Sequence, residues 1–180
     1  MTLSASRAIS TPLPAGLPAL AKGRDAFECL ARNVSVVSAR RGDALHGMTV
    51  DSLAAICPDP MRVVVAVRRD SRWWSVVTDT GAFAASVLSP GQEAVATWFG
   101  SRSRGEGRRQ FACVPWHLGP VTGAPLLDGA SLTLECLVVA ATVVGHQVVV
   151  VADLVGAGWL RSQGADLPEH PRCRLRQPRG

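Results

Sequence analysis

Short apolar runs separated by turn residues dominate the middle of the chain. Residues 34–39 (VSVVSA) and 44–56 both have the composition of a strand, and residues 40–43 (RRGD) between them are typical of a turn, so we expect a hairpin. Residues 61–68 (MRVVVAVR) form a nearly continuous β-branched run, which predicts a strand that is buried on both faces.

Signals for two helices and a further strand come next along the chain. The sequence predicts a helix over residues 71–80, which Gly81 can end, and a strand over residues 82–88. The Ser-Pro-Gly-Gln sequence at 89–92 predicts a second helix, because a serine N-cap followed by proline at the first helical position is a favourable start. We expect this helix to run to about Phe99.

The remaining segments complete a pattern in which strands outnumber helices. Residues 24–33 predict a short helix, and residues 100–110 are charged and rich in glycine, so we expect a loop there. Residues 131–144 and 146–156 predict two long apolar strands. Because the strands follow one another directly, the pattern favours a mainly β fold, a β-barrel with a few helices, over a doubly wound sheet.

The composition fits one folded domain with polar ends. The chain has 180 residues, of which 47% are hydrophobic, so it is long enough to bury a core. We assign the folded domain to residues 22–160. A flexible arm rich in Ser, Pro and Ala is expected at 1–21, and a polar, basic tail at 161–180.

The formal net charge is +5, and nearly all of the positive charge is arginine. The arginines fall into three groups, at residues 68–72, 102–109 and 172–179, rather than into one stripe. An anionic small ligand or a codon preference explains this balance as well as nucleic acid does. Nucleic-acid binding is the weakest of these interpretations, because the chain has no tyrosine and no aromatic residues interleaved with basic ones.

The five cysteines predict neither a zinc site nor a disulfide framework. Their number is odd and no pair has C-x-x-C spacing, so reduced thiols are favoured. No apolar run reaches the roughly 18 residues of a membrane span. Prolines interrupt the N-terminal segment, so we expect no signal peptide. Together these observations predict a cytoplasmic protein.

Five stretches carry, in order, the motifs of one known family. They are GMTVDS at 47–52, DPMRVVVAVRRDSRWW at 59–74, GAFAASVLSPGQEAVATWFG at 81–100, APLLDGASLTLEC at 124–136 and GHQVVVVADLVGAG at 145–158. Over residues 24–158 the chain therefore resembles the flavin reductase-like family. The fold of that family is the FMN-binding split barrel, and its members include the reductase components of two-component flavin monooxygenases.

The resemblance implies an enzyme, an NAD(P)H-dependent flavin reductase. NADH or NADPH is then the hydride donor and FMN or FAD the flavin, while the protein supplies binding and orientation. The reduced flavin would diffuse to a partner monooxygenase. The resemblance also implies a homodimer with flavin sites near the interface.

Ser71 and Arg72 form a candidate phosphate site on physical grounds as well as by resemblance. Free N–H groups and the positive dipole end at a helix start favour an anion, and the arginine adds a charged fork. The alternative is an N-cap serine beside a solvated arginine. The resemblance places the flavin phosphate near this turn.

The resemblance also implies which residues surround the flavin ring. Thr49, Asp51 and Ser52 are more polar than a half-buried strand requires, which a flavin lying against them explains; the alternative is a solvated edge strand. His146 lies near flavin and nicotinamide in the family, although a lone turn histidine is the alternative. The candidate cofactor-binding residues, besides Ser71 and Arg72, are Met48, Thr49, Val50, Asp51, Ser52, Ser86, Val87, Leu88 and Gln92.

Three positions depart from the family pattern and keep other functions open, one of them Asn33, which stands where many members have Gly. Asp51 stands where the family usually has Ser or Asn, and Ser86 replaces the usual Asn. One alternative is a repurposed split-barrel enzyme acting on an organic substrate, with or without flavin, in which Asp51 and His146 are the catalytic acid–base candidates. A non-enzymatic binder of flavin, haem or nucleic acid is the third hypothesis.

Overall fold

Antiparallel strands make up most of the structure, a computed structural model that describes residues 34–159. The predicted helix at 24–33, the arm at 1–21 and the tail at 161–180 lie outside the described residues. The elements are β1 Ser35–Arg41, β2 Ala44–Val50, β3 Ala54–Pro58, β4 Met61–Arg68, α2 Arg72–Thr80, β5 Ala82–Val87, α3 Glu93–Gly100, the 3-10 helix η1 Gly107–Phe111, β6 Trp116–Leu118, β7 Pro125–Leu127, β8 Leu132–Val144 and β9 Gln147–Trp159.

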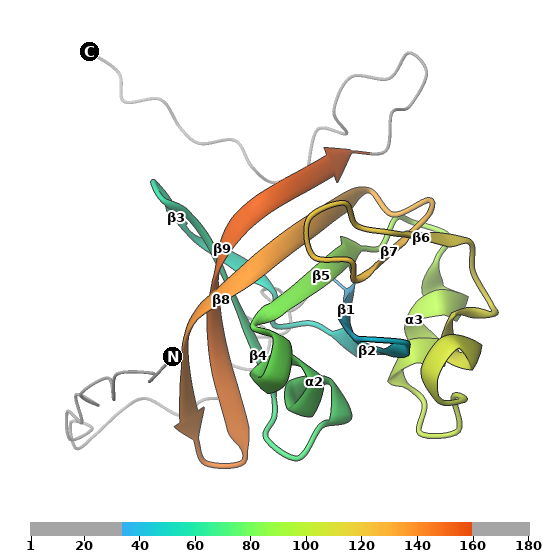
Figure 1. Ribbon diagram of the computed structural model, residues 1–180. Coiled ribbons are helices and arrows are strands. Elements are labelled where there is room, and N and C mark those ends of the chain that lie inside the picture. The colour runs from blue at the N-terminus through green and yellow to red at the C-terminus, as the bar shows by residue number, and fades with distance from the viewer. Residues whose placement is uncertain (1–33, 160–180) are drawn as a thin grey trace, which may run out of the picture.

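The main sheet runs in the order β2-β1-β5-β8-β9-β4-β3, and β6 pairs with β7 in a small second sheet. In Figure 1 the long β8–β9 hairpin spans most of the height of the drawing, while α2 lies at the lower end and α3 lies beyond the β1–β2 hairpin. The mainly β prediction and the predicted pair of long C-terminal strands are therefore confirmed.

The predicted hairpin of β1 and β2 is confirmed, with Gly42 in the left-handed conformation at its turn. The prediction of one continuous strand over 44–56 is wrong. The chain bends after Val50, and β3 then pairs with β4 instead of continuing beside β1. The bend is held because the hydroxyl of Ser52 donates to the carbonyl of Ala66 (2.8 Å) and accepts from its N–H (3.1 Å).

The prediction that β4 is buried on both faces is also wrong. Val63, Val65 and Val67 are buried, whereas Val64 and Ala66 between them are only half-buried. The β-branched run reflects the preference of these residues for strands, which does not by itself report burial on the second face.

The helix α2 begins and ends where the sequence predicts. Ser71 is extended and caps the helix, and Gly81 ends it with a φ of 67°. The second helix begins later than predicted, at Glu93, because residues 89–92 form a turn rather than the first helical turn. The predicted loop at 100–110 leads into η1, the 3-10 helix.

The strand β2 contributes side chains to two apolar clusters. The larger one packs the sheet against α2, where Trp73 and Phe83 meet edge to face with ring centroids 5.2 Å apart. The smaller one packs Phe99 of α3 and Phe111 of η1 together, also with centroids 5.2 Å apart. In the described part of the chain, neither helix is long and apolar enough to cross a membrane.

Candidate functional site

A cavity of about 480 Å³ opens at the N-terminus of α2. Ser71 lies there as the helix cap, and its hydroxyl accepts a hydrogen bond from the N–H of Trp74 at 3.2 Å. The helix forms here because an extended serine whose side chain satisfies a free N–H is a favourable start. The lining residues are His46, Met48, Arg68, Asp70, Ser71, Arg72, Arg102 and Arg104.

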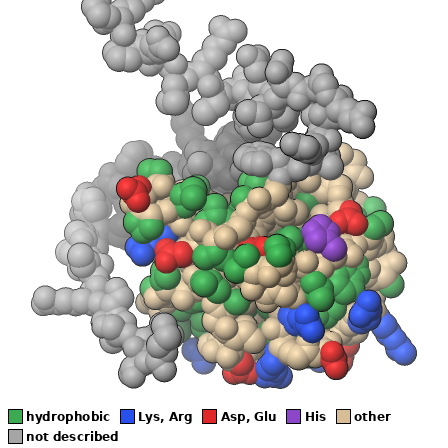
Figure 2. Space-filling model, turned by 45° about the horizontal axis from the view of Figure 1, so that its top comes forward, with side chains coloured by type: hydrophobic (Ala, Val, Ile, Leu, Met, Phe, Trp, Pro, Cys, Tyr) green, Lys and Arg blue, Asp and Glu red, His purple; other side chains and the backbone are tan. Residues whose placement is uncertain are grey.

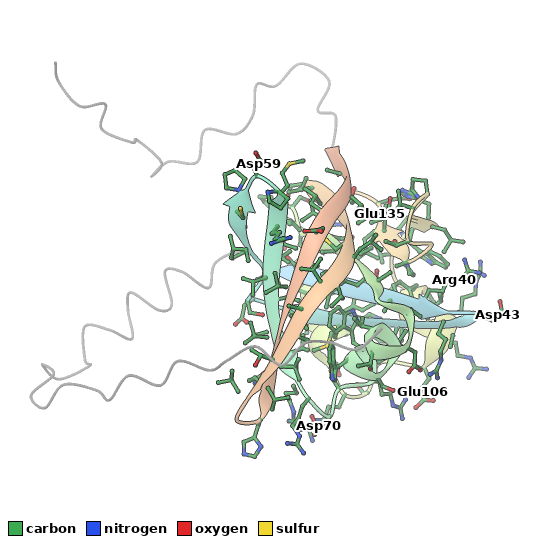
Figure 3. All side chains as sticks on the ribbon, turned by 60° about the vertical axis from the view of Figure 1, so that its left-hand side comes forward. Arg40, Asp43, Asp59, Asp70, Glu106 and Glu135 are labelled. Carbon is green, nitrogen blue, oxygen red and sulfur yellow. The ribbon has the colours of Figure 1, made fainter. Side chains whose placement is uncertain are left out.

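Positive charge prevails in this cavity. Arg68 is held by both carboxylate oxygens of Asp70, and Arg72 is ion-paired with Glu106. Figure 3 shows Asp70 and Glu106 at the same end of the molecule, opposite to Asp59. Within residues 34–159, no carboxylate pairs with the other two arginines of the lining, Arg102 and Arg104. The cavity is therefore suited to an anion.

His46 of β2 forms a buried corner of this cavity. The side chain of Gln110 approaches Nδ1 of His46 at 3.2 Å, and Nη2 of Arg104 lies 3.5 Å from its Nε2. Burial is the main cause that lowers the pKa of His46 to about 4, and the charges of Arg104 and Arg72 lower it further. His46 is thus a neutral imidazole at pH 7.

A second cavity, of about 560 Å³, lies beside the first and shares Arg68 and Asp70 with it. Its other lining residues include His146, which is exposed in the β8–β9 turn. The carbonyl of His146 accepts a hydrogen bond from the N–H of Arg69 at 3.1 Å, which ties this turn to the end of β4. The two cavities together bring His146 into the neighbourhood of the α2 N-terminus.

The structure brings some of the predicted strand residues to the cavity and not others. Met48 lines it, whereas Val50 is buried in the core. Thr49 donates its hydroxyl to the carbonyl of Ala96 in α3 at 2.7 Å, so this side chain joins β2 to α3. Asp51 is exposed in the bend that follows β2 and is not among the residues lining either cavity.

The predicted residues after β5 use their polar groups inside the fold. Ser86 is buried, and its hydroxyl accepts from the N–H of Leu127 at 3.0 Å. Gln92 accepts from the N–H of Ser89 at 3.0 Å through Oε1 and donates to the carbonyl of Asp128 at 3.1 Å through Nε2. Val87 and Leu88 are half-buried, and Leu88 packs against the smaller apolar cluster.

The sequence interpretation singled out neither His46 nor Gln110, and it treated the segment that contains Arg104 as a solvated loop. His46 directly precedes the GMTVDS stretch, and a histidine within an otherwise apolar strand was the available signal. Arg104 and Gln110 lie in a segment expected to be a solvated loop, so no sequence pattern pointed to their contacts with β2. In the described residues no group of three or more His, Cys, Asp or Glu could hold a metal ion.

Comparison with known proteins identifies the family of the chain. The family model of the flavin reductase-like domain matches residues 27–169. An NADPH-flavin oxidoreductase of Streptomyces viridifaciens is 38% identical over 107 residues, 59% of this chain and 55% of that protein. An NADH-dependent FAD reductase of Streptomyces globisporus is 37% identical over 115 residues, 64% of this chain and 63% of that protein. The chain thus matches less than two thirds of the length of these relatives.

Solved structures show the same fold. The flavin reductase component of a bacterial two-component tryptophan halogenase superposes with a TM-score of 0.71 at 30% identity, covering 78% of this chain and 88% of that one. The NADH:FAD oxidoreductase of Streptomyces globisporus, solved in complex with NAD and FAD fragments, gives a TM-score of 0.68 at 28% identity, covering 81% and 87%. The split-barrel prediction is therefore confirmed, and the chain belongs to the flavin reductase-like family.

Proposed function

We propose that the protein is an NAD(P)H:flavin oxidoreductase that reduces FMN or FAD. The observation that carries this proposal is the arginine-rich cavity at the capped N-terminus of α2, in a chain that belongs to the flavin reductase-like family. The names of its relatives support the activity, since they include reductases of FAD and of flavin with NADH or NADPH as donor.

Ser71 and Arg72 would hold the flavin phosphate. Both residues line the cavity at the start of α2, and a helix start attracts an anion. Arg72 is exposed and ion-paired with Glu106, so an incoming phosphate has to compete with that carboxylate. Because exposed ion pairs contribute little to stability, the arginine can exchange partners at low cost.

The flavin ring would lie near the end of β2 and the turn of His146. With the hydroxyls of Thr49 and Ser52 engaged inside the fold, the backbone groups of residues 49–52 are the better candidates for contacts with the ring edge. Ser86 and Gln92 would act by holding β5, β7 and α3 in place around the ring. His146 lines the neighbouring cavity and would approach the bound nucleotides, whereas Asp51 is exposed but lines neither cavity.

Once both nucleotides are bound, their ring systems carry the chemistry, which is transfer of a hydride equivalent from nicotinamide to flavin. The chain orients the two rings and keeps them stacked. Like the relative that serves a tryptophan halogenase, the protein would supply reduced flavin to a separate partner, and we propose a flavin-dependent monooxygenase. We also propose a cytoplasmic location, in which the free thiols of the described cysteines stay reduced.

We further propose a homodimer. Exposed aliphatic side chains on β8 (Leu137, Val139, Val143 and Val144) are the candidates for its interface. Figure 2 shows hydrophobic side chains across the centre of one face, with Lys and Arg mostly along its lower margin. Replacing Leu137 by Glu should shift the mass measured by light scattering from dimer to monomer. A monomeric wild-type protein would contradict the proposal.

The proposed activity is tested by oxidation of NADH and NADPH by purified protein, with and without added FMN or FAD. We expect turnover that depends on flavin. Combining NADH or NADPH with FMN or FAD gives four pairs of substrates, and their rates identify the preferred pair. Absence of turnover with every pair would contradict the proposal and favour the repurposed enzyme, whose substrate is organic.

The phosphate assignment has its own test. The double variant Ser71→Ala, Arg72→Gln should weaken flavin binding more than it slows turnover at saturating flavin. Ser75→Ala is the matched control for the helix, because Ser75 is exposed in the next turn of α2. Unchanged flavin affinity in the double variant would remove the assignment.

A further inference from the structure

The backbone of Gly47 fixes two side chains beside His46. Its N–H donates to Oε1 of Gln110 at 2.9 Å, and its carbonyl accepts from Nε of Arg104 at 3.2 Å. Both bonds lie on the free edge of β2, where backbone groups would otherwise lack partners. The side chains of Gln110 and Arg104 are therefore held in defined orientations.

The orientation of Gln110 determines which nitrogen of His46 carries the proton. Because Oε1 of Gln110 accepts from Gly47, its Nε2 is the group that faces Nδ1 of His46. An amide nitrogen only donates, so Nδ1 accepts and the proton of the neutral imidazole resides on Nε2. This agrees with the low pKa of His46, which keeps the ring neutral at pH 7.

The N–H at Nε2 then faces a second donor. Its neighbour, 3.5 Å away, is Nη2 of Arg104, and a guanidinium accepts no hydrogen bond. Arg104 uses Nε and Nη1 for the carbonyls of Gly47 and Ser101, which leaves Nη2 without an acceptor in the described part of the chain. The His46 side chain is buried, with a relative exposure of 8%, and its contact with Gln110 at Nδ1 holds the ring in this orientation.

Two donors that converge at one wall of a basic cavity require an acceptor between them. We propose that the Nε2–H of His46 and the Nη2 of Arg104 clamp an oxygen of a nucleotide phosphate other than the flavin phosphate at Ser71. This inference rests on the proposed function and deepens it. The second phosphate is either the adenylate phosphate of FAD, absent from FMN, or the 2′-phosphate of NADPH, absent from NADH.

The charge around the clamp favours a phosphate over a neutral acceptor. Arg102 lines the same cavity, and like Arg104 it has no carboxylate partner among residues 34–159. Burial and the charge of Arg72 lower the pKa of Arg104 from its usual value, as expected for a cation among cations without a counter-ion. Charge-assisted hydrogen bonds to a phosphate oxygen would relieve this repulsion.

Two substitutions of His46 distinguish the loss of the proposed phosphate contact, which we call the clamp, from damage to the fold. His46→Asn places an amide near the position of Nδ1, where it can still meet Gln110, but it removes the donor at Nε2. His46→Gln reaches the position of Nε2 and keeps a donor facing the cavity. Arg109→Gln is the charge control, because Arg109 belongs to the same segment but is not among the residues lining the cavity.

The measurement is equilibrium binding of FAD, FMN, NADPH and NADH to each full-length variant by calorimetry. For His46→Asn we expect a roughly tenfold loss in one affinity ratio, FAD over FMN or NADPH over NADH, because one hydrogen bond to a charged group is removed. The ratio that falls identifies the source of the phosphate. His46→Gln and Arg109→Gln should keep both ratios within about threefold of wild type.

The inference is overturned if His46→Asn leaves both ratios unchanged, or if Arg109→Gln lowers a ratio as much as His46→Asn does. Because binding is measured without turnover, an inactive wild-type protein contradicts the proposed function and leaves this test intact. Conversely, flavin-dependent turnover with unchanged ratios in His46→Asn removes the clamp and leaves the proposed function standing.

Discussion

The two histidines that line the neighbouring cavities are held in opposite ways. His46 lies on a strand covered by α3 and η1, and its neighbours are fixed by the backbone of Gly47. His146 is exposed in the turn between β8 and β9, where only its carbonyl is tied to the fold. One histidine is therefore a buried, neutral donor with fixed neighbours, and the other is an exposed side chain that lines the second cavity.

The difference indicates that the fixed, buried contacts around His46 belong to a binding site. A buried polar network is costly unless every member is satisfied, so a network with two converging donors is informative. An exposed turn histidine carries no such cost and gives no such information. His46 and its neighbours are thus the stronger structural indication of a ligand. His146, by contrast, belongs to one of the five stretches that carry the family resemblance.

The largest expected effect belongs to the buried histidine and concerns the response of stability to acid. The pKa of His46 is lowered from 6.5 to about 4 in the folded protein, so between these pH values the unfolded chain binds a proton that the folded one does not. The free energy of unfolding should therefore fall as the pH is lowered through this window, with about 2–3 kcal/mol from this group.

Urea unfolding of wild type and His46→Asn at several pH values measures this term. The variant should lose less stability on acidification than wild type does. The charged residues near His46 are Arg104, Arg72 and Glu106, and they are the same in wild type and in His46→Asn. The difference between the two curves of stability against pH therefore isolates the contribution of His46. Parallel curves for wild type and His46→Asn would contradict the account.

The next effect is steric and concerns the strand that carries the buried histidine. A Cβ on Gly47 would lie 2.7 Å from Cε1 of Phe99 and 3.0 Å from Cζ of Phe111, both in packed rings. We expect Gly47→Ala to cost about 1–3 kcal/mol in the free energy of unfolding. In Gly100→Ala the new methyl meets only Thr49, at 3.8 Å, so equal losses in the two variants would refute this explanation.

A smaller loss is expected where α2 begins. Ser71→Ala removes the cap that accepts from the N–H of Trp74, and it should lower the free energy of unfolding by about 1 kcal/mol. Ser75→Ala, in the next turn of the same helix, should not lower it. Thermal unfolding followed by circular dichroism compares the two, and a stable Ser71→Ala variant would show that the cap is dispensable.

The smallest effect on stability belongs to the exposed histidine. His146→Ala should change the free energy of unfolding by no more than about 0.5 kcal/mol, because the side chain is at the surface. If His146 approaches the nicotinamide, the variant should still turn over more slowly at saturating flavin. A destabilised His146→Ala variant would mean that the turn is part of the folded core, and the contrast with His46 would be lost.

The sequence predicted the bounds of α2 and the β1–β2 hairpin because the local preferences of a few residues determine them. Ser71 and Gly81 bracket α2, and Gly42 makes the β1–β2 turn, through conformations that these residues favour. The break at residues 51–53 was missed although Asp51 and Ser52 interrupt the apolar pattern, because their polarity was attributed to a bound flavin. The bonds from Ser52 to Ala66 reveal the change of strand partner.

The site was predicted in part, for reasons that concern distance along the chain. Ser71, Arg72 and Met48 line the cavity, as the motifs indicated. Ser86 and Gln92 instead use their side chains to join segments 36 to 41 residues apart, which no local pattern records. The contacts of His46 are with Arg104 and Gln110, which lie 58 and 64 residues further along the chain. Only the folded structure therefore identifies His46 as part of the cavity.

A crystal structure of the protein with bound FAD tests the account most directly, through the position of the phosphates. The account predicts one phosphate at the N-terminus of α2 beside Ser71 and Arg72. If FAD rather than NADPH supplies the second phosphate, its oxygen should lie between Nε2 of His46 and Nη2 of Arg104. A flavin whose phosphates lie away from the cavity at α2, for example against the turn of His146, would contradict the central claim.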